Sequence, residues 1–98
     1  MKYLTLIPDY TGSCIQDDYN GRIELNELNL PQGLINEITD WHKSYRKIIP
    51  LSEEQRLGKI QEIERLDLQG LELAERISQM ISGDAKVRYY SEGKCKYL

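Results

Sequence analysis

Three side chains in the sequence belong to the types that covalent catalysis and metal binding use most often. They are the single histidine, His42, and the two cysteines, Cys14 and Cys95. A thiol beside an imidazole can act as a nucleophile, and a converging set of such groups can bind a metal ion. However, His42 lies at the edge of an apolar helical pattern, and nothing in the sequence brings either cysteine near it. We therefore expect a structural histidine and two free thiols, with no catalysis, no metal and no cofactor.

Adjacent carboxylates at Asp17 and Asp18 raise the question of a cation site. A calcium loop needs oxygen ligands at alternate positions and a closing bidentate glutamate, and this segment lacks that spacing. Asn20-Gly21 follows, and this dipeptide is the strongest short signal for a hairpin turn. The segment is therefore predicted to form a turn.

Four carboxylates lie within the eleven residues from Asp17 to Glu27, with only Arg22 nearby to neutralise them. Residues 1–42 carry a net charge of −5, whereas residues 43–98 carry +2. An acidic front half disfavours nucleic acid as the partner and suits a basic protein instead. A solvated acidic surface kept for solubility would have the same composition. We nominate as partner-binding residues the four carboxylates Asp17, Asp18, Glu24 and Glu27.

The element that must position the rest is a predicted helix from Leu30 to Ile49, which Pro50 ends. Its apolar residues recur at helical spacing and form one stripe, with the only tryptophan, Trp41, at the centre. Asn29 is its expected N-cap. Since no other side chain can bury more apolar area, we expect Trp41 to be central to the core.

A second helical pattern runs from Ser52 to Ser82. Ser52 and Gln55 have the spacing of a capping box at its start, and Gly83 is expected to terminate it. Gly70 lies on its apolar face and would permit close approach to the first helix. Because a helix of this length is unusual and both Lys59 and Asp67 interrupt the apolar face, a bend or break is expected near Asp67–Gly70.

Strands are predicted at both ends of the chain. Residues 2–7 are dense in strand formers with apolar residues on both faces, and residues 85–90 alternate apolar residues with cations. Residues 14–25 are expected to form a hairpin or edge strands, after a turn over residues 8–13. The predicted fold is α+β, with strands 2–7 and 85–90 side by side and two long helices packed on one face of the small sheet.

Length and composition predict one soluble domain over residues 1–98, with 40% apolar and 30% charged residues. No apolar run is long enough to cross a bilayer, and the N-terminal apolar stretch is too short for a signal peptide. We expect a cytoplasmic protein without a membrane partner.

The order of these features resembles that of small bacterial immunity proteins, which protect cells from the toxins of contact-dependent growth inhibition. The likeness covers most of the chain, and its motifs are structural. The residues that carry it are Ile7-Pro8-Asp9-Tyr10, Ser13, Gly21, Ile23 to Leu30, Trp41, Tyr45, Gly70 to Ile77, and Val87-Arg88-Tyr89-Tyr90.

The resemblance implies a non-enzymatic cytoplasmic protein that binds and neutralises a toxin domain, often a nuclease. Such a nuclease would be basic where it binds nucleic acid, and an acidic surface could occupy that site. Two other functions stay open from the residues alone. One is a small enzyme or metal-binding domain that uses His42 and the cysteines. The other is a nucleic-acid-associated regulator that uses the basic, tyrosine-containing tail from Arg88 to Tyr97.

Overall fold

The computed structural model of the chain describes residues 2–8, 14–81 and 85–98, and the side chains of Lys2 and Arg22 are outside this description. The predicted turn at residues 8–13 and the terminator Gly83 therefore lie largely outside the described residues. The elements in chain order are β1 (Lys2–Leu6), β2 (Ile15–Asp17), β3 (Gly21–Arg22), the short 3-10 helix η1 (Leu25–Leu28), α1 (Gln32–Tyr45), α2 (Glu53–Leu57), α3 (Ile60–Met80), β4 (Ala85–Ser91) and β5 (Lys96–Tyr97).

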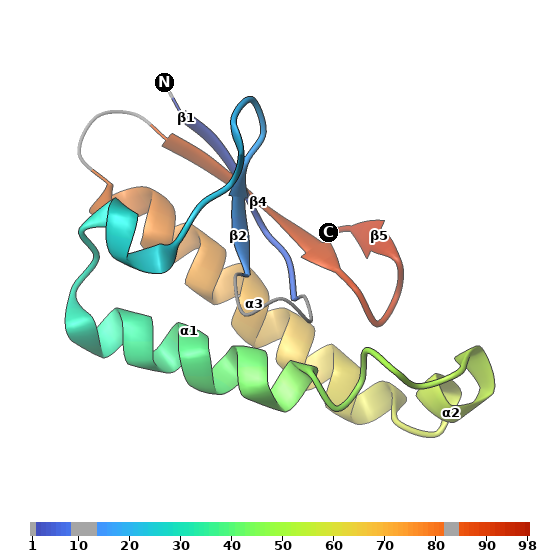
Figure 1. Ribbon diagram of the computed structural model, residues 1–98. Coiled ribbons are helices and arrows are strands. Elements are labelled where there is room, and N and C mark those ends of the chain that lie inside the picture. Colours follow the sequence, from blue (N-terminus) through green and yellow to red (C-terminus); the bar gives the residue numbers. More distant parts are fainter. Residues whose placement is uncertain (1, 9–13, 82–84) are drawn as a thin grey trace.

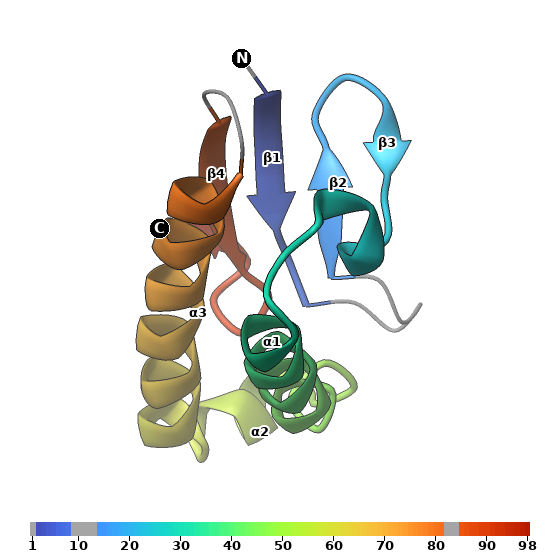
Figure 2. The same cartoon turned by 90° about the vertical axis from the view of Figure 1, so that its left-hand side faces the viewer.

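The five strands form one sheet in the order β3-β2-β1-β4-β5. β1 and β4 lie side by side and parallel, from Lys2 opposite Ala85 to Leu6 opposite Tyr89, and the other neighbours are antiparallel. The predicted pairing of the two end segments is therefore confirmed. The long helices α1 and α3 lie together on one face of this sheet (Figures 1 and 2), which confirms the predicted α+β architecture.

Trp41 lies at the centre of the core, as predicted. It is 1% exposed, and its ring packs against those of Tyr45 and Tyr89 at centroid distances of 5.8 and 5.9 Å. Its indole Nε1 donates a hydrogen bond to the Leu66 carbonyl oxygen of α3, at 2.9 Å. Trp41 thus connects α1, α3 and β4 through one side chain.

The prediction of one helix from Ser52 to Ser82 is wrong. The chain forms α2, turns at Gly58 and Lys59, and then begins α3 at Ile60. The predicted capping box at the start of α2 is confirmed. The backbone N–H of Gln55 donates to Ser52 Oγ at 3.2 Å, and the backbone N–H of Ser52 donates to Gln55 Oε1 at 3.0 Å. The break falls at Gly58–Lys59, where Gly58 has low helix propensity, and not at the expected Asp67–Gly70.

The predicted first helix is shorter than expected at both ends. Its N-cap position is Pro31, while Asn29 instead ends η1 in a left-handed conformation with φ of 55°. Residues 46–50 form turns after Tyr45, and Ile48 still reaches the core at 1% exposure. The predicted hairpin forms as β2 and β3, with Gly21 at φ of 85°. However, β3 ends at Arg22 and not at the expected Leu25, where η1 begins instead.

Candidate functional site

Asp17 closes the turn between β2 and β3. Its Oδ1 accepts hydrogen bonds from the amide N–H groups of Tyr19 at 2.8 Å and Asn20 at 3.2 Å. A carboxylate that binds the backbone two and three residues ahead forms an Asx turn, which is a common reason for aspartate at this position. The Asp17 carboxylate therefore stabilises the turn that was predicted at this segment.

Asp18 is joined to two strands beyond its own turn. Its Oδ1 accepts a hydrogen bond from the Thr5 hydroxyl of β1 at 2.7 Å, and its Oδ2 forms an ion pair with Arg88 of β4 at 3.2 Å. The expectation that only Arg22 would be near these carboxylates is wrong for Asp18. Arg88 was missed because 70 residues separate it from Asp18 in sequence.

Glu24 and Glu27 lie at η1, after β3. Glu27 Oε2 accepts a hydrogen bond from the Glu24 amide N–H at 3.1 Å, so this carboxylate stabilises the start of the 3-10 turn. Both residues are exposed. The turn that holds Asp17 and Asp18 and the helix η1 lie at opposite ends of the short strand β3.

Strand register separates the first two carboxylates further. Asp17 is opposite Leu4, whose side chain is fully buried beneath the helices, whereas Asp18 bonds to Thr5 on the other face. Successive side chains of a strand point to opposite faces of a sheet. The four nominated carboxylates therefore do not form one compact group.

A buried polar cluster around Asp67 was not predicted, although Asp67 was recognised as a charged residue on the apolar face of the second helical pattern. This residue of α3 is 2% exposed, and its carboxylate accepts hydrogen bonds from the hydroxyls of Tyr45 at 2.9 Å, Tyr89 at 2.6 Å and Ser91 at 2.7 Å. The Tyr45 hydroxyl oxygen in turn accepts from the Gly93 amide N–H at 2.8 Å. Lys94 Nζ lies 3.9 Å from Asp67 Oδ2.

This cluster ties α1, α3 and β4 together and has the character of a structural network. Burial raises the pKa of Tyr45 to about 12, and burial together with the hydrogen bond to Asp67 raises the pKa of Tyr89. Both phenols are therefore neutral donors at neutral pH. Each hydroxyl proton is already donated to the carboxylate, so the cluster is arranged for stability.

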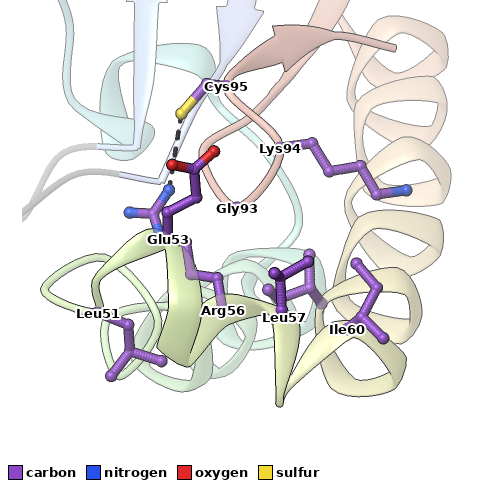
Figure 3. Close-up of a pocket in the computed structure, with 9 residues that line it drawn as sticks. Leu51, Glu53, Arg56, Leu57, Ile60, Gly93, Lys94 and Cys95 are labelled. Carbon is purple, nitrogen blue, oxygen red and sulfur yellow. Dashed lines mark hydrogen bonds between the residues drawn. The ribbon is translucent and has the colours of Figure 1, made fainter.

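A cavity of about 530 Å³ lies between α2, the start of α3 and the turn after β4 (Figure 3). Its wall is mainly apolar, from Leu51, Leu57, Ile60 and Ile63. Arg56 crosses it and donates to the carbonyl oxygens of Ile49 at 2.8 Å and Glu92 at 2.7 Å. Arg56 thereby fastens α2 to two loops, and this contact was also absent from the sequence prediction.

The residues considered for chemistry are not assembled into a catalytic group. Cys14 precedes β2 and Cys95 follows β4, so β1 and β4 stand between them in the sheet. Burial raises the pKa of the Cys14 thiol to about 12, which leaves it protonated at neutral pH. His42 is buried on α1. Within residues 2–8, 14–81 and 85–98, no three His, Cys, Asp or Glu side chains could together hold a metal ion.

The basic, tyrosine-containing tail is divided between two faces of the sheet. Tyr89 points into the core toward Asp67, whereas Tyr90 packs edge to face against Tyr97 of β5 at a centroid distance of 5.1 Å. Arg88 forms an ion pair with Asp18. In the part of the chain that the structure describes, no helix is long and apolar enough to cross a membrane.

Comparison with known families gave one match. A family model described as Serratia CdiI immunity protein-like matches residues 2–92, which include every helix and strand except β5. A search of curated proteins found no match. The matched range contains the four nominated carboxylates and the cluster around Asp67.

Proposed function

Because this chain belongs to the Serratia CdiI immunity protein-like family, we propose that it binds a cognate toxin domain that is a nuclease and blocks its active site or the access of its substrate. Immunity proteins of contact-dependent growth inhibition neutralise a toxin, so the protective role follows from the family. The match over residues 2–92 is the observation that carries this proposal. The site of action is the cytoplasm, and the protein acts as an inhibitor and not as an enzyme.

Charge supports a nuclease as the target. The net charge of −5 over residues 1–42 suits a surface that replaces nucleic acid phosphates on a basic toxin. Residues of this half form β1, β2, β3, η1 and most of α1. We place the contact on the β2–β3 side of the sheet, where Asp17, Asp18, Glu24 and Glu27 lie close to one another in sequence.

The four carboxylates Asp17, Asp18, Glu24 and Glu27 are our proposed toxin-contacting residues. The backbone bonds to Asp17 and Glu27 hold these carboxylates in place before binding, which lowers the entropy lost on association. Asp18 differs, because a toxin cation would have to compete with Arg88 for its Oδ2. We expect Asp18 to contribute less to the rate of association than Glu24.

The test replaces all four with amides, as Asp17→Asn, Asp18→Asn, Glu24→Gln and Glu27→Gln. Amides keep an oxygen acceptor for the turn, for Thr5 and for η1, so folding should be little affected. Association with the purified toxin domain encoded next to this gene should slow, and its dependence on salt should flatten.

A matched control removes four exposed carboxylates from the helices instead, namely Asp40, Glu64, Glu72 and Glu75. Both variants change the net charge equally, so a general field effect would slow both. If the two variants associate at the same rate, the acidic residues of β2, β3 and η1 are not the contact surface. If the parent chain neither binds this toxin nor protects cells from it, the proposed function itself fails.

A further inference from the structure

The face of the sheet opposite the helices carries a set of ordered tyrosines. Register places Tyr3 on this face next to Lys86, and Tyr90 opposite Tyr97, while the buried Leu4 and Leu6 point the other way toward the helices. We use the name tyrosine face for Tyr3, Tyr19, Arg88, Tyr90 and Tyr97. Among the described residues no helix lies over it, as Figures 1 and 2 show.

Three of these tyrosines expose much of their surface: Tyr3 is 37% exposed, Tyr97 52% and Tyr19 78%. In a protein of this size, large exposed side chains gathered on one face mark an interaction site more often than a solvated surface. Tyrosine and arginine are also the residues that most often dominate the binding energy of protein interfaces.

The side chains of the tyrosine face hold one another in place. Tyr3 and Tyr19 pack edge to face at a centroid distance of 5.8 Å, and Tyr90 and Tyr97 do so at 5.1 Å. The Arg88 guanidinium lies 4.5 Å from the centre of the Tyr97 ring and pairs with Asp18. Rings fixed in this way lose little entropy when a partner covers them, which favours tight binding.

The charge of this face distinguishes between a protein and a nucleic acid as the partner. Stacking rings beside an arginine could bind single-stranded nucleic acid, but that requires a cationic surface along the phosphates. Here the Arg88 charge is already matched by Asp18 at 3.2 Å, and the chain carries a net charge of −3. Among the described side chains, Lys86 beside Tyr3 then supplies most of the remaining positive charge of this face, which is too little to follow a phosphate backbone.

We propose that the tyrosine face is the main docking surface for the cognate toxin domain, with Asp18 and Arg88 at its centre. This inference rests on the proposed function and refines its site, because it makes buried aromatic contacts the main source of affinity. The complementary toxin surface would be apolar, with hydrogen-bond acceptors for the tyrosine hydroxyls.

The experiment measures the dissociation constant and dissociation rate of the purified toxin domain encoded next to this gene, with Tyr19→Ala and Tyr97→Ala as separate variants. Each should weaken binding by ten- to a hundredfold, mainly through faster dissociation. Both side chains are more than half exposed, so the variants should melt near the parent temperature. Tyr19→Ala is the decisive one, because this ring is 78% exposed and touches the fold least.

Controls come from the solvent face of α3, where Leu68 is 69% exposed and Met80 52%. Leu68→Ala and Met80→Ala remove similar exposed apolar surface, and binding should change by less than about twofold. Full affinity in both tyrosine variants would overturn this inference while leaving the proposed function in place. A parent chain that does not bind the toxin would overturn both, and tight binding of a fluorescent single-stranded oligonucleotide that Tyr19→Ala abolishes would also overturn the inference.

Discussion

Asp67 has the environment of a core residue although it is charged. Its two oxygens accept from Tyr45, Tyr89 and Ser91, and these three hydroxyls come from α1 and β4. A buried carboxylate of this kind stabilises a fold only while its donors are all present. The burial of each of these polar side chains is therefore favourable only because the others satisfy its hydrogen bonds.

Replacing Asp67 with leucine should destabilise the protein strongly. Asp67→Leu leaves three buried hydroxyls without their acceptor, and we expect a loss of about 3 kcal/mol or more in the free energy of unfolding. Tyr89→Phe removes one donor and leaves the carboxylate two others, so its cost should be about 1–2 kcal/mol. Urea unfolding measures both, with Glu64→Gln on the exposed side of α3 as control. Parent-like stability of Asp67→Leu would contradict the structural role of the network.

High pH should weaken the fold through the same phenols. Burial raises the folded-state pKa of Tyr45 from 10.0 to about 12, so the stabilisation from its neutral form is complete below pH 10. Above pH 10 the unfolded chain loses a proton that the folded chain keeps, and stability falls until about pH 12. The raised pKa of Tyr89 acts in the same direction.

Unfolding midpoints in urea, measured on both sides of pH 10, should show this decline. In Tyr45→Phe/Tyr89→Phe the decline should be smaller, because neither side chain can ionise. Tyr19→Phe serves as the control, since this side chain is 78% exposed and its hydroxyl is not part of the cluster around Asp67. An identical decline in the parent and the double variant would assign it to other groups.

Trp41→Ala should cost about 3–5 kcal/mol, because the lost ring leaves a cavity in the core. The hydrogen bond from Nε1 to the Leu66 carbonyl oxygen adds to this cost. Thermal melting gives the result directly. A shift of only a degree or two would mean that the ring contributes little to the core.

At the scale of elements, one close contact determines how α3 lies on the sheet. A Cβ at Gly70 would overlap the ring of Tyr89 on β4. The expected reason for this glycine was close approach to the first helix, and that expectation is wrong, because the close neighbour is a strand residue. Gly70 lets α3 approach β4 closely enough for Asp67 to reach the Tyr89 hydroxyl.

Gly70→Ala should therefore lower the free energy of unfolding by about 1–3 kcal/mol, because the added methyl group would overlap the Tyr89 ring. This ring cannot easily move aside, since its hydroxyl bonds to Asp67 and it packs against Trp41. Gly33→Ala on α1 is the matched control. A Cβ at Gly33 meets nothing within 4 Å, so this change should stabilise the helix by about 0.5–1 kcal/mol. Both values come from urea unfolding, and the same sign for both would contradict the packing argument.

Local patterns predicted most of the elements. The stripe around Trp41, the capping box at Ser52 and the alternation in β4 each depend on residues close in sequence, and all three are present. Contacts across long separations were not predictable in this way. Asp67 was recognised as an interruption of the apolar face, but its partners Tyr45, Tyr89 and Ser91 are 22 to 24 residues away in sequence. The local sequence around Arg88 is that of a solvated strand face, and the sequence around Arg56 is that of an exposed helical turn.

The candidate site likewise combines a local feature that was predicted with long-range contacts that were not. Sequence identified the turn at Asp17 correctly but treated four carboxylates as one group, whereas strand register sends Asp17 and Asp18 to opposite faces. Alternation in β4 was predictable. The place of β4 beside β1 was also predicted. However, the position of β2 in the sheet, and hence the packing of Tyr19 against Tyr3 on the open face, was not.

At the scale of the whole molecule, the core holds the fold together without a cross-link. Cys14 is buried and Cys95 exposed, and both are free thiols. Because the apolar side chains of α1, α3 and the sheet pack into one cluster, we expect neither metal nor disulfide to be needed. Unfolding midpoints with a chelator, with a reductant and with neither should agree. A large drop with either reagent would contradict this.

The parallel pairing of β1 with β4 has a consequence for how the protein is made. β1 leaves the ribosome well before its parallel partner β4, which begins only at Ala85. Until then Leu4 and Leu6 cannot be enclosed by the sheet, and such distant pairing closes slowly. The nascent chain therefore holds β1 with one edge open until β4 emerges, although β2 can already pair with the other edge. The β1–β4 pair, and with it the closed core, can form only once translation has passed β4.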